Sequence, residues 1–164
     1  MSYGVLVNPN PPPNGQVLHR LLSQAFAHME GRIDPPSSVN LLDPEAVSSK
    51  LGSEDVVIAR TGDRIVGCLF AHRRQDAYHL GKIAVSHHMR QKGIARAMVD
   101  AAEARAAELG LSSLTLQSRV ELTENHAAFN AMGFRQTGTF THPGFDAPTS
   151  LVFTRPLPQR GPLS

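Results

Sequence analysis

The spacing of apolar positions changes from strand-like to helix-like near the middle of the chain. Residues 78–86 include the β-branched Ile83 and Val85 and carry no helical stripe, which indicates a strand. Residues 93–109 are rich in Ala, Glu, Arg and Met, and their apolar positions recur at helical spacing. Gly110 follows the last periodic residue, where a left-handed helix cap is expected. The pattern therefore predicts a strand, a turn and an amphipathic helix in succession.

The chain before this strand contains two helical patterns and three strand-like ones. They predict, in chain order, a strand over 3–7, helices over 16–29 and 43–52, and hairpin strands over 55–60 and 64–71. Asp43 and Pro44 suit the N-cap and the first turn of the second helix. The Pro-Pro and Ser-Ser pairs of residues 32–40 indicate a loop between the two helices.

The chain after the central helix again alternates between strand and helix. The patterns predict a strand over 113–117, a helix over 123–133, and strands over 134–140 and 149–155. Because a helix separates residues 78–86 from residues 113–117, these two strands should run parallel with a right-handed crossover. The predicted fold class is α/β (α+β), a mixed, mostly antiparallel sheet with helices on both faces. We expect one domain over 1–164, with a core at about 3–156 and a flexible tail at 157–164.

Composition and charge exclude several classes of protein. The chain has 164 residues, of which 41% are hydrophobic, so it is long enough for one buried core. A net charge of +2 without a basic run argues against a nucleic-acid partner. The N-terminus lacks the features of a signal peptide, and no apolar stretch approaches the roughly 20 residues that span a bilayer. Cys68, the only cysteine, is expected to be a buried thiol, and no residues have metal-ligand spacing. We therefore expect a cytoplasmic protein without membrane, metal or nucleic-acid partners.

The turn between the central strand and helix is basic and contains a glycine. The first N–H groups of a helix have no intrahelical partner, and the helix dipole favours negative charge there. Gly93 allows close approach of a ligand, while Arg90, Lys92 and Arg96 add positive charge. The turn is therefore a candidate pyrophosphate site, and the alternative is an ordinary basic start of a helix. The six residues alone do not decide between these interpretations.

Three segments in the second half of the chain resemble the GNAT N-acetyltransferase family. The family's pyrophosphate motif, [Q/R]-x-x-G-x-[G/A], is matched by Arg90, Gln91, Lys92, Gly93, Ile94 and Ala95. The sequence KIAV at 82–85 is similar to the family's central strand, and NHAAFNAMGF at 125–134 is similar to its closing helix and Gly-Phe turn. The resemblance covers roughly residues 55–155 with the elements in the right order. It implies acetyl-CoA as acetyl donor.

The resemblance also implies where the donor would bind. Backbone groups around Ile83, Ala84 and Val85, freed by a splay between the parallel strands, would hold the thioester and the pantetheine arm. Arg96 would extend the phosphate site. Asn125 is similar to the asparagine that bonds the pantetheine arm, although it could also cap its helix.

The resemblance implies a position for a catalytic base and a position for a catalytic acid, and the residue at the acid position departs from the family. The position that often holds a carboxylate base is His79, whose unperturbed pKa of about 6.5 suits that role. Glu121, in the loop after the next strand, is the second candidate, unless it is simply solvated. The position of the usual tyrosine acid is Phe129, which lines the donor site but has no proton to give. Ser118 or Tyr78 could substitute, the thiolate could leave unassisted or through water, or the protein could bind CoA without fast transfer.

The acceptor implied by the resemblance is a primary amine of a small molecule or peptide, attacking directly in a ternary complex. Residues 29–40 and 141–148 would select it. Their charged members are Arg32, Asp34 and Asp146, and His142 could line the same cleft. The alternative is a non-catalytic acyl-CoA-binding or regulatory module on the same fold. A nucleotide-binding protein is disfavoured because the chain lacks Walker and GxGxxG motifs. A homodimer is the default expectation for assembly.

Overall fold

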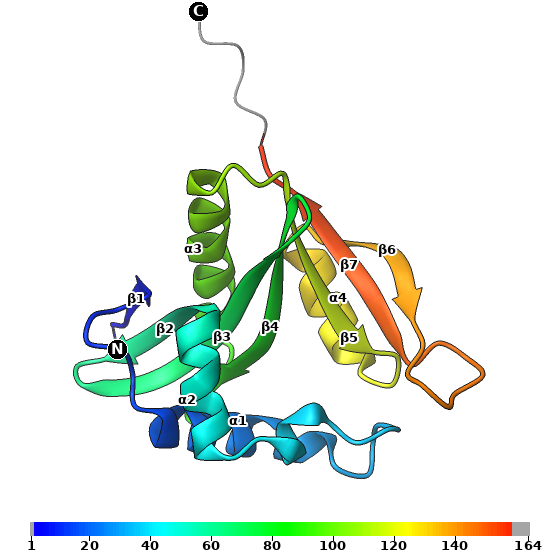
Figure 1. Cartoon of the computed structure of the whole chain (residues 1–164), viewed down its shortest axis with the longest axis horizontal. Coiled ribbons are helices and arrows are strands. Elements are labelled where there is room, and N and C mark those ends of the chain that lie inside the picture. Colours follow the sequence, from blue (N-terminus) through cyan, green and yellow to red (C-terminus); the bar gives the residue numbers. More distant parts are fainter. Residues whose placement is uncertain (1, 159–164) are drawn as a thin grey trace, which may run out of the picture.

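A computed structural model describes residues 2–158 and contains one seven-stranded sheet (Figure 1). The strands are β1 (Gly4–Val7), β2 (Asp55–Thr61), β3 (Arg64–Arg74), β4 (Ala77–Val85), β5 (Ser113–Arg119), β6 (Arg135–Phe140) and β7 (Ser150–Pro156). Their order across the sheet is β1-β2-β3-β4-β5-β7-β6. Each pair of neighbours is antiparallel except β4 and β5. The predicted mixed, mostly antiparallel sheet and the parallel pair are confirmed.

Four α-helices cover the two faces of the sheet. They are α1 (Gly15–Phe26), α2 (Pro44–Ser53), α3 (Ile94–Glu108) and α4 (Thr123–Ala131). Short 3-10 helices occupy Ala27–Met29, Ser38–Leu41 and His87–Met89. The single helix predicted over 16–29 therefore changes to 3-10 geometry for its last three residues. The loop predicted over 32–40 is confirmed in its first half and becomes a 3-10 turn at its end.

Local sequence signals account for several element ends. Asn14 caps α1 by accepting the Gln16 N–H at 2.8 Å, and Asp43 caps α2 by accepting the Ala46 N–H at 2.7 Å. Gly110 has a φ of +73°, so the predicted left-handed cap after α3 is confirmed.

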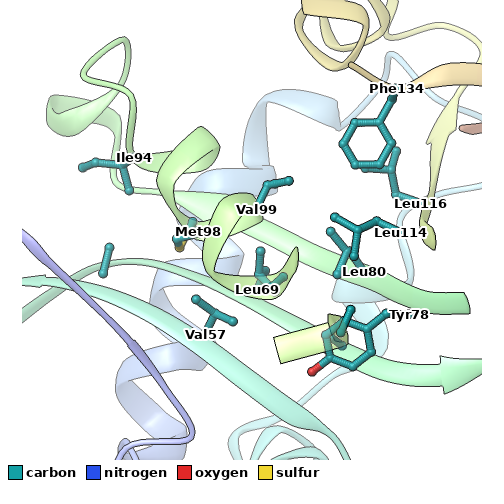
Figure 2. Packing of buried hydrophobic residues seen from close by; sticks show 14 of the residues in the cluster. Val57, Leu69, Tyr78, Leu80, Ile94, Met98, Val99, Leu114, Leu116 and Phe134 are labelled. Atoms are coloured by element: carbon teal, nitrogen blue, oxygen red, sulfur yellow. The ribbon is translucent and has the colours of Figure 1, made fainter. Parts of the chain in front are cut away.

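Two apolar clusters lie on opposite faces of the sheet. One cluster joins α3 to the sheet, and Figure 2 shows Met98 and Val99 of this helix against Leu69 of β3. The other cluster joins α1 and α2 to the opposite face and includes Leu22 and Val47. Helices on both faces agree with the predicted fold class.

The β4–β5 pair is short, and this positions the site. These strands pair only from Ala77 with Ser113 to His79 with Thr115. Beyond that point β4 continues along β3, whereas β5 follows β7 as far as Arg119. The two parallel strands therefore separate and leave a wedge within the sheet (Figure 1).

The described chain ends beside this sheet. The Leu157 N–H donates to the Ser112 carbonyl at 2.9 Å, so the chain remains paired at the start of the predicted tail. Residues 159–164, where most of that tail was expected, lie outside the described residues. None of the helices between residues 2 and 158 is both long and apolar enough to cross a membrane.

Candidate active site

A cleft of about 910 Å³ occupies the wedge between β4 and β5. Its walls are formed by the diverging strands, the start of α3, one side of α4 and the segment that follows α1. Ser150 of β7 and His142 of the β6–β7 loop also line it. The cleft brings together both loops expected to select an acceptor and the turn expected to bind phosphate.

The turn before α3 has the backbone geometry of an anion site. Gly93 is the N-cap with a φ of +80°, a conformation that L side chains rarely adopt. No side chain caps α3, and its first turn contains no acidic residue. The first N–H groups of α3 are therefore available to a ligand in the cleft, as the motif predicts.

The basic side chains of this turn are less available than the sequence suggests. Arg90 donates to the Ala25 carbonyl at 3.2 Å, and Arg96 donates to the Ala131 carbonyl at 3.1 Å. Both side chains line the cleft, but each also ties a neighbouring helix to the turn. Gln91, Gly93, Ile94 and Ala95 line the cleft as well, whereas Lys92 does not. The free backbone N–H groups, more than the side-chain charges, therefore define this end of the cleft.

The wall formed by β4 leaves an edge without a strand partner. Ile83, Ala84 and Val85 all line the cleft, and β5 pairs with none of them. The ladder with β3 is irregular opposite this stretch, and Lys82 adopts a left-handed φ of +54°. This is the separation of strands that the resemblance implied.

His79 lies at the point where the parallel strands part. Its Nδ1 is 2.9 Å from the Thr115 hydroxyl, and its ring centroid is 5.5 Å from that of His72. Burial, reinforced by the charges of Arg74 and His72, lowers the pKa of His79 to about 4. The unperturbed value of about 6.5 therefore does not hold at this site, and a pKa of about 4 leaves His79 neutral at neutral pH.

Glu121 lies beside the cleft instead of lining it. Its Oε2 accepts the Asp34 N–H at 3.0 Å, and its Oε1 is buried without a partner among residues 2–158. The carboxylate that does line the cleft is Glu124, which pairs with Arg32 at 2.7 Å. Arg32 is therefore engaged by a carboxylate of the protein, and Asp146 lies on an exposed loop outside the cleft.

The side of the cleft formed by α4 carries Asn125 and Phe129. The alternative that Asn125 caps its helix is wrong, because the N-cap is Leu122 and no side chain caps α4. The Phe129 ring packs against Phe134 and Phe153 with centroids 6.1 and 6.0 Å away. It presents only carbon to the cleft.

The two hydroxyls considered as substitute acids have different surroundings. Tyr78 is buried in the α3 cluster, where Figure 2 shows it beside Leu80. Its hydroxyl donates to the Asp55 carboxylate, so burial and this bond raise the pKa of Tyr78 and remove it from consideration. Ser118 lines the cleft, and its hydroxyl is buried without a partner among residues 2–158.

A model of the acetyltransferase (GNAT) family matches residues 18–134 of the chain. The chain belongs to the GNAT acetyltransferase family. This membership confirms the predicted acyltransferase class and acetyl-CoA as the donor. A search of curated protein sequences finds no match to the chain.

Solved GNAT structures are similar to the chain over nearly its whole length. A PaiA N-acetyltransferase from Thermoplasma acidophilum in complex with coenzyme A is 11% identical, with a TM-score of 0.78 over 95% of this chain and 99% of that one. A GNAT acetyltransferase from Elizabethkingia anophelis with acetyl-CoA bound is 17% identical, with a TM-score of 0.67 over 94% and 98%. The ribosomal-protein-S18-alanine N-acetyltransferase from Escherichia coli is 15% identical, with a TM-score of 0.67 over 98% and 97%. At these identities the likeness shows the GNAT fold alone.

Two cationic residues of this GNAT cleft were missed by sequence reasoning. Lys82 and Arg119 both line it, on β4 and at the end of β5. The bulge that turns Lys82 into the cleft leaves no mark in the alternation of residues. Arg119 lies beyond the strand end predicted at residue 117, although its place at the carboxyl end of a parallel strand was a usable signal.

Proposed function

We propose that this chain transfers an acetyl group from acetyl-CoA to a primary amine by direct attack in a ternary complex. The observation that carries the proposal is one continuous cleft between two chemically different ends. One end is the uncapped start of α3, and the other contains the neutral His79. The unpaired edge of β4 runs between them.

The residues of the cleft fit acetyl-CoA, which supplies an activated thioester when bound. The first N–H groups of α3, with Gly93 open to close approach, suit a pyrophosphate. The unpaired β4 edge at residues 83–85 suits the amide groups of a pantetheine arm and a thioester carbonyl. Asn125 faces the same cleft with no capping role.

Direct attack is favoured because the only thiol is unsuited to carry an acetyl group. Cys68 is fully buried in the cluster beneath α1, and burial raises its pKa to about 12. It does not line the cleft. A covalent route through this cysteine would need a thiolate that its surroundings disfavour.

We assign His79 to the movement of the amine proton. When Nδ1 carries the hydrogen and donates to Thr115, Nε2 is left as an acceptor. A pKa of about 4 makes this nitrogen a weak base, so it suits an amine that enters neutral or a proton relayed by water. Thr115 then acts as a positioning residue for the ring.

Ser118 is the best placed group to protonate the leaving thiolate. Its hydroxyl is buried, faces the cleft and has no partner among residues 2–158. Phe129 cannot serve because it lacks a proton. A thiolate that leaves unassisted remains the alternative route.

The experiment is thiol release from acetyl-CoA in the presence of amines, amino acids and short peptides, with CoA affinity measured in parallel by calorimetry. We expect CoA to bind and at least one class of amine to release thiol. Phe129 favours the second candidate, a non-catalytic acyl-CoA-binding module. Tight CoA binding with no release for any amine would support that candidate, and absence of CoA binding would contradict both.

A further inference from the structure

The acceptor end of the cleft carries two cations that the proposed chemistry does not use. Lys82 projects from the bulge of β4, and its Nζ donates to the Ser38 hydroxyl. Arg119, at the end of β5, donates to the Pro35 and Pro36 carbonyls at 2.7 and 3.2 Å. Both side chains line the cleft and contact the segment that follows α1.

Neither cation has a carboxylate partner within residues 2–158. The salt bridges in this part of the chain include neither Lys82 nor Arg119. Both side chains are partly buried, and this burial lowers the pKa of each. A partly buried cation without a paired carboxylate gains from a ligand that supplies negative charge.

The carboxylates near these two cations either have other partners or lie outside the lining of the cleft. Glu121 and Asp34 interact with Arg119 at a distance, but neither lines the cleft, and Glu121 accepts the Asp34 N–H. Glu54 interacts with Lys82 at a distance, but it binds Lys50 and lies 3.2 Å from His72. Glu124, the carboxylate in the cleft wall, pairs with Arg32. The cleft lining at this end therefore holds two cations, Lys82 and Arg119, and one carboxylate, Glu124, which is already paired with Arg32.

We propose that the acceptor is an amine that also carries an anionic oxygen group, a carboxylate or phosphate, which binds Lys82 and the adjacent Arg119. This inference rests on the proposed function and names its substrate class. The anion would replace the missing counter-ion of Lys82, while Ser38 offers a further hydroxyl. The amine would then lie toward His79, three residues earlier on the same strand.

The other residues that line this end indicate that the rest of the acceptor is apolar. Phe26, Met29 and Ile33 contribute apolar surface to the cleft. An amine with an apolar body and one anionic group, such as an apolar amino acid, fits this combination. Polyamines and other multiply cationic acceptors are disfavoured, because Lys82 and Arg119 would repel them.

The test compares acceptors that differ only in the anionic group. For each apolar amino acid, kcat/KM is measured with the acid, its amide, its decarboxylated amine and the matching aminophosphonate. We expect the wild-type protein to prefer an anionic form by about tenfold or more. The preferred anion then identifies the natural group as carboxylate or phosphate.

The variant Lys82→Met should lose the preference, with kcat/KM for the anionic acceptor falling about 10- to 100-fold. The reaction of the neutral amide and the affinity for CoA should stay unchanged. Lys82→Arg should restore part of the preference. Arg20→Met is the matched control, because Arg20 is an exposed cation of α1 outside the cleft and its loss should change nothing. If Lys82→Met does not fold, Lys82→Gln and Ser38→Ala provide the comparison.

Each contrary outcome has a separate meaning. Equal rates with and without the anionic group in the wild-type protein would overturn this inference and leave the proposed function intact. A lower CoA affinity in Lys82→Met would also overturn the inference, because Lys82 would then bind the donor and not the acceptor. If no amine releases thiol, the proposed function fails, and calorimetry with N-acetylated amino acids in the presence of CoA decides the inference. If the wild-type protein binds an N-acetylated amino acid and Lys82→Met does not, the inference is supported. If the wild-type protein does not bind it, the inference is overturned.

Discussion

The two helices that flank the cleft, α3 and α4, are attached to the sheet in different ways. The α3 helix buries five residues, Ile94, Met98, Val99, Ala102 and Ala106. The α4 helix buries none, although Phe129 packs partly against the same cluster. Hydrogen bonds at its ends hold α4, such as His126 to the Arg119 carbonyl at 2.9 Å and Arg96 to the Ala131 carbonyl.

This difference indicates which wall of the cleft is complete without a ligand. The α3 helix is part of the core and holds in place the N–H groups that we propose bind phosphate. The α4 helix presents the exposed Ala128 and the partly buried Phe129 to a cleft that a donor would fill. We therefore expect α3 to be rigid in the free protein and α4 to gain most from binding.

The largest expected effect is the loss of stability when α3 is truncated in the core. Met98→Ala should reduce the free energy of unfolding by about 2–5 kcal/mol, because Met98 is fully buried. The matched change on α4, Asn130→Ala, should stay within about 0.5 kcal/mol because Asn130 is exposed. Urea denaturation measures both, and similar losses would contradict the contrast between the helices.

Gly93→Glu should weaken CoA binding by at least about 100-fold, because it places negative charge and bulk at the start of α3. The left-handed backbone also adds a stability cost of about 1–2 kcal/mol. Gly62→Glu is the control, since Gly62 has a φ of +56° in the β2–β3 turn, away from the cleft. Calorimetry should show normal affinity in the control, and equal losses would assign the effect to backbone strain.

His79→Ala should lower kcat about 100-fold, because the proposed acceptor of the amine proton is lost. The affinity for CoA should change little, because His79 belongs to neither of the helices that flank the donor. In the wild-type protein His79 stays neutral until the pH falls through about 4, so its contribution to kcat/KM should be constant above about pH 5. The folded pKa lies below the unfolded value of about 6.5, so stability decreases as pH falls from about 6.5 toward 4. If kcat/KM of the wild-type protein changed with pH near 6.5, and the change were absent in the variant, the buried environment of His79 would be contradicted.

Amide hydrogen exchange offers a direct comparison of the two helices. Saturating CoA should slow exchange in α4 about tenfold, while the buried interior of α3 should change little. Gly93→Glu treated with the same CoA is the control. Equal protection of both helices would show that α4 is already as well anchored as α3.

The smallest effect is expected from Phe129→Tyr. The added hydroxyl would face the cleft at a half-buried position, so stability should change by less than about 1 kcal/mol. If protonation of the thiolate limits turnover, kcat should rise several-fold. An unchanged kcat together with a large fall in Ser118→Ala would identify Ser118 as the acid already in use.

Local signals predicted most of the elements, because capping residues and apolar periods act over a few neighbours. The strand, turn and helix around Gly93 follow from such signals. The position of β7 between β5 and β6 does not, since it depends on pairing between distant segments.

The chemistry of the site was less predictable because it depends on contacts between distant segments. His79 lines the cleft, but its pKa follows from burial and from the charge of Arg74, which the sequence does not show. Arg90 and Arg96 look free in the motif, yet distant carbonyls accept their hydrogens. The bulge at Lys82 is also invisible in the sequence. The predicted homodimer and cytoplasmic location stay predictions.

The place of β7 in the sheet also sets the order in which the molecule can be completed during synthesis. Three residue pairs join β5 to β4, whereas seven join it to β7, which is the last of the seven strands of this sheet to be made. A nascent chain that has not yet released residues 150–156 from the ribosome can form α1, α3 and the β2–β3–β4 ladder. The far wall of its cleft would still lack most of its support. Acetyl-donor binding should therefore appear only after residues 150–156 have emerged.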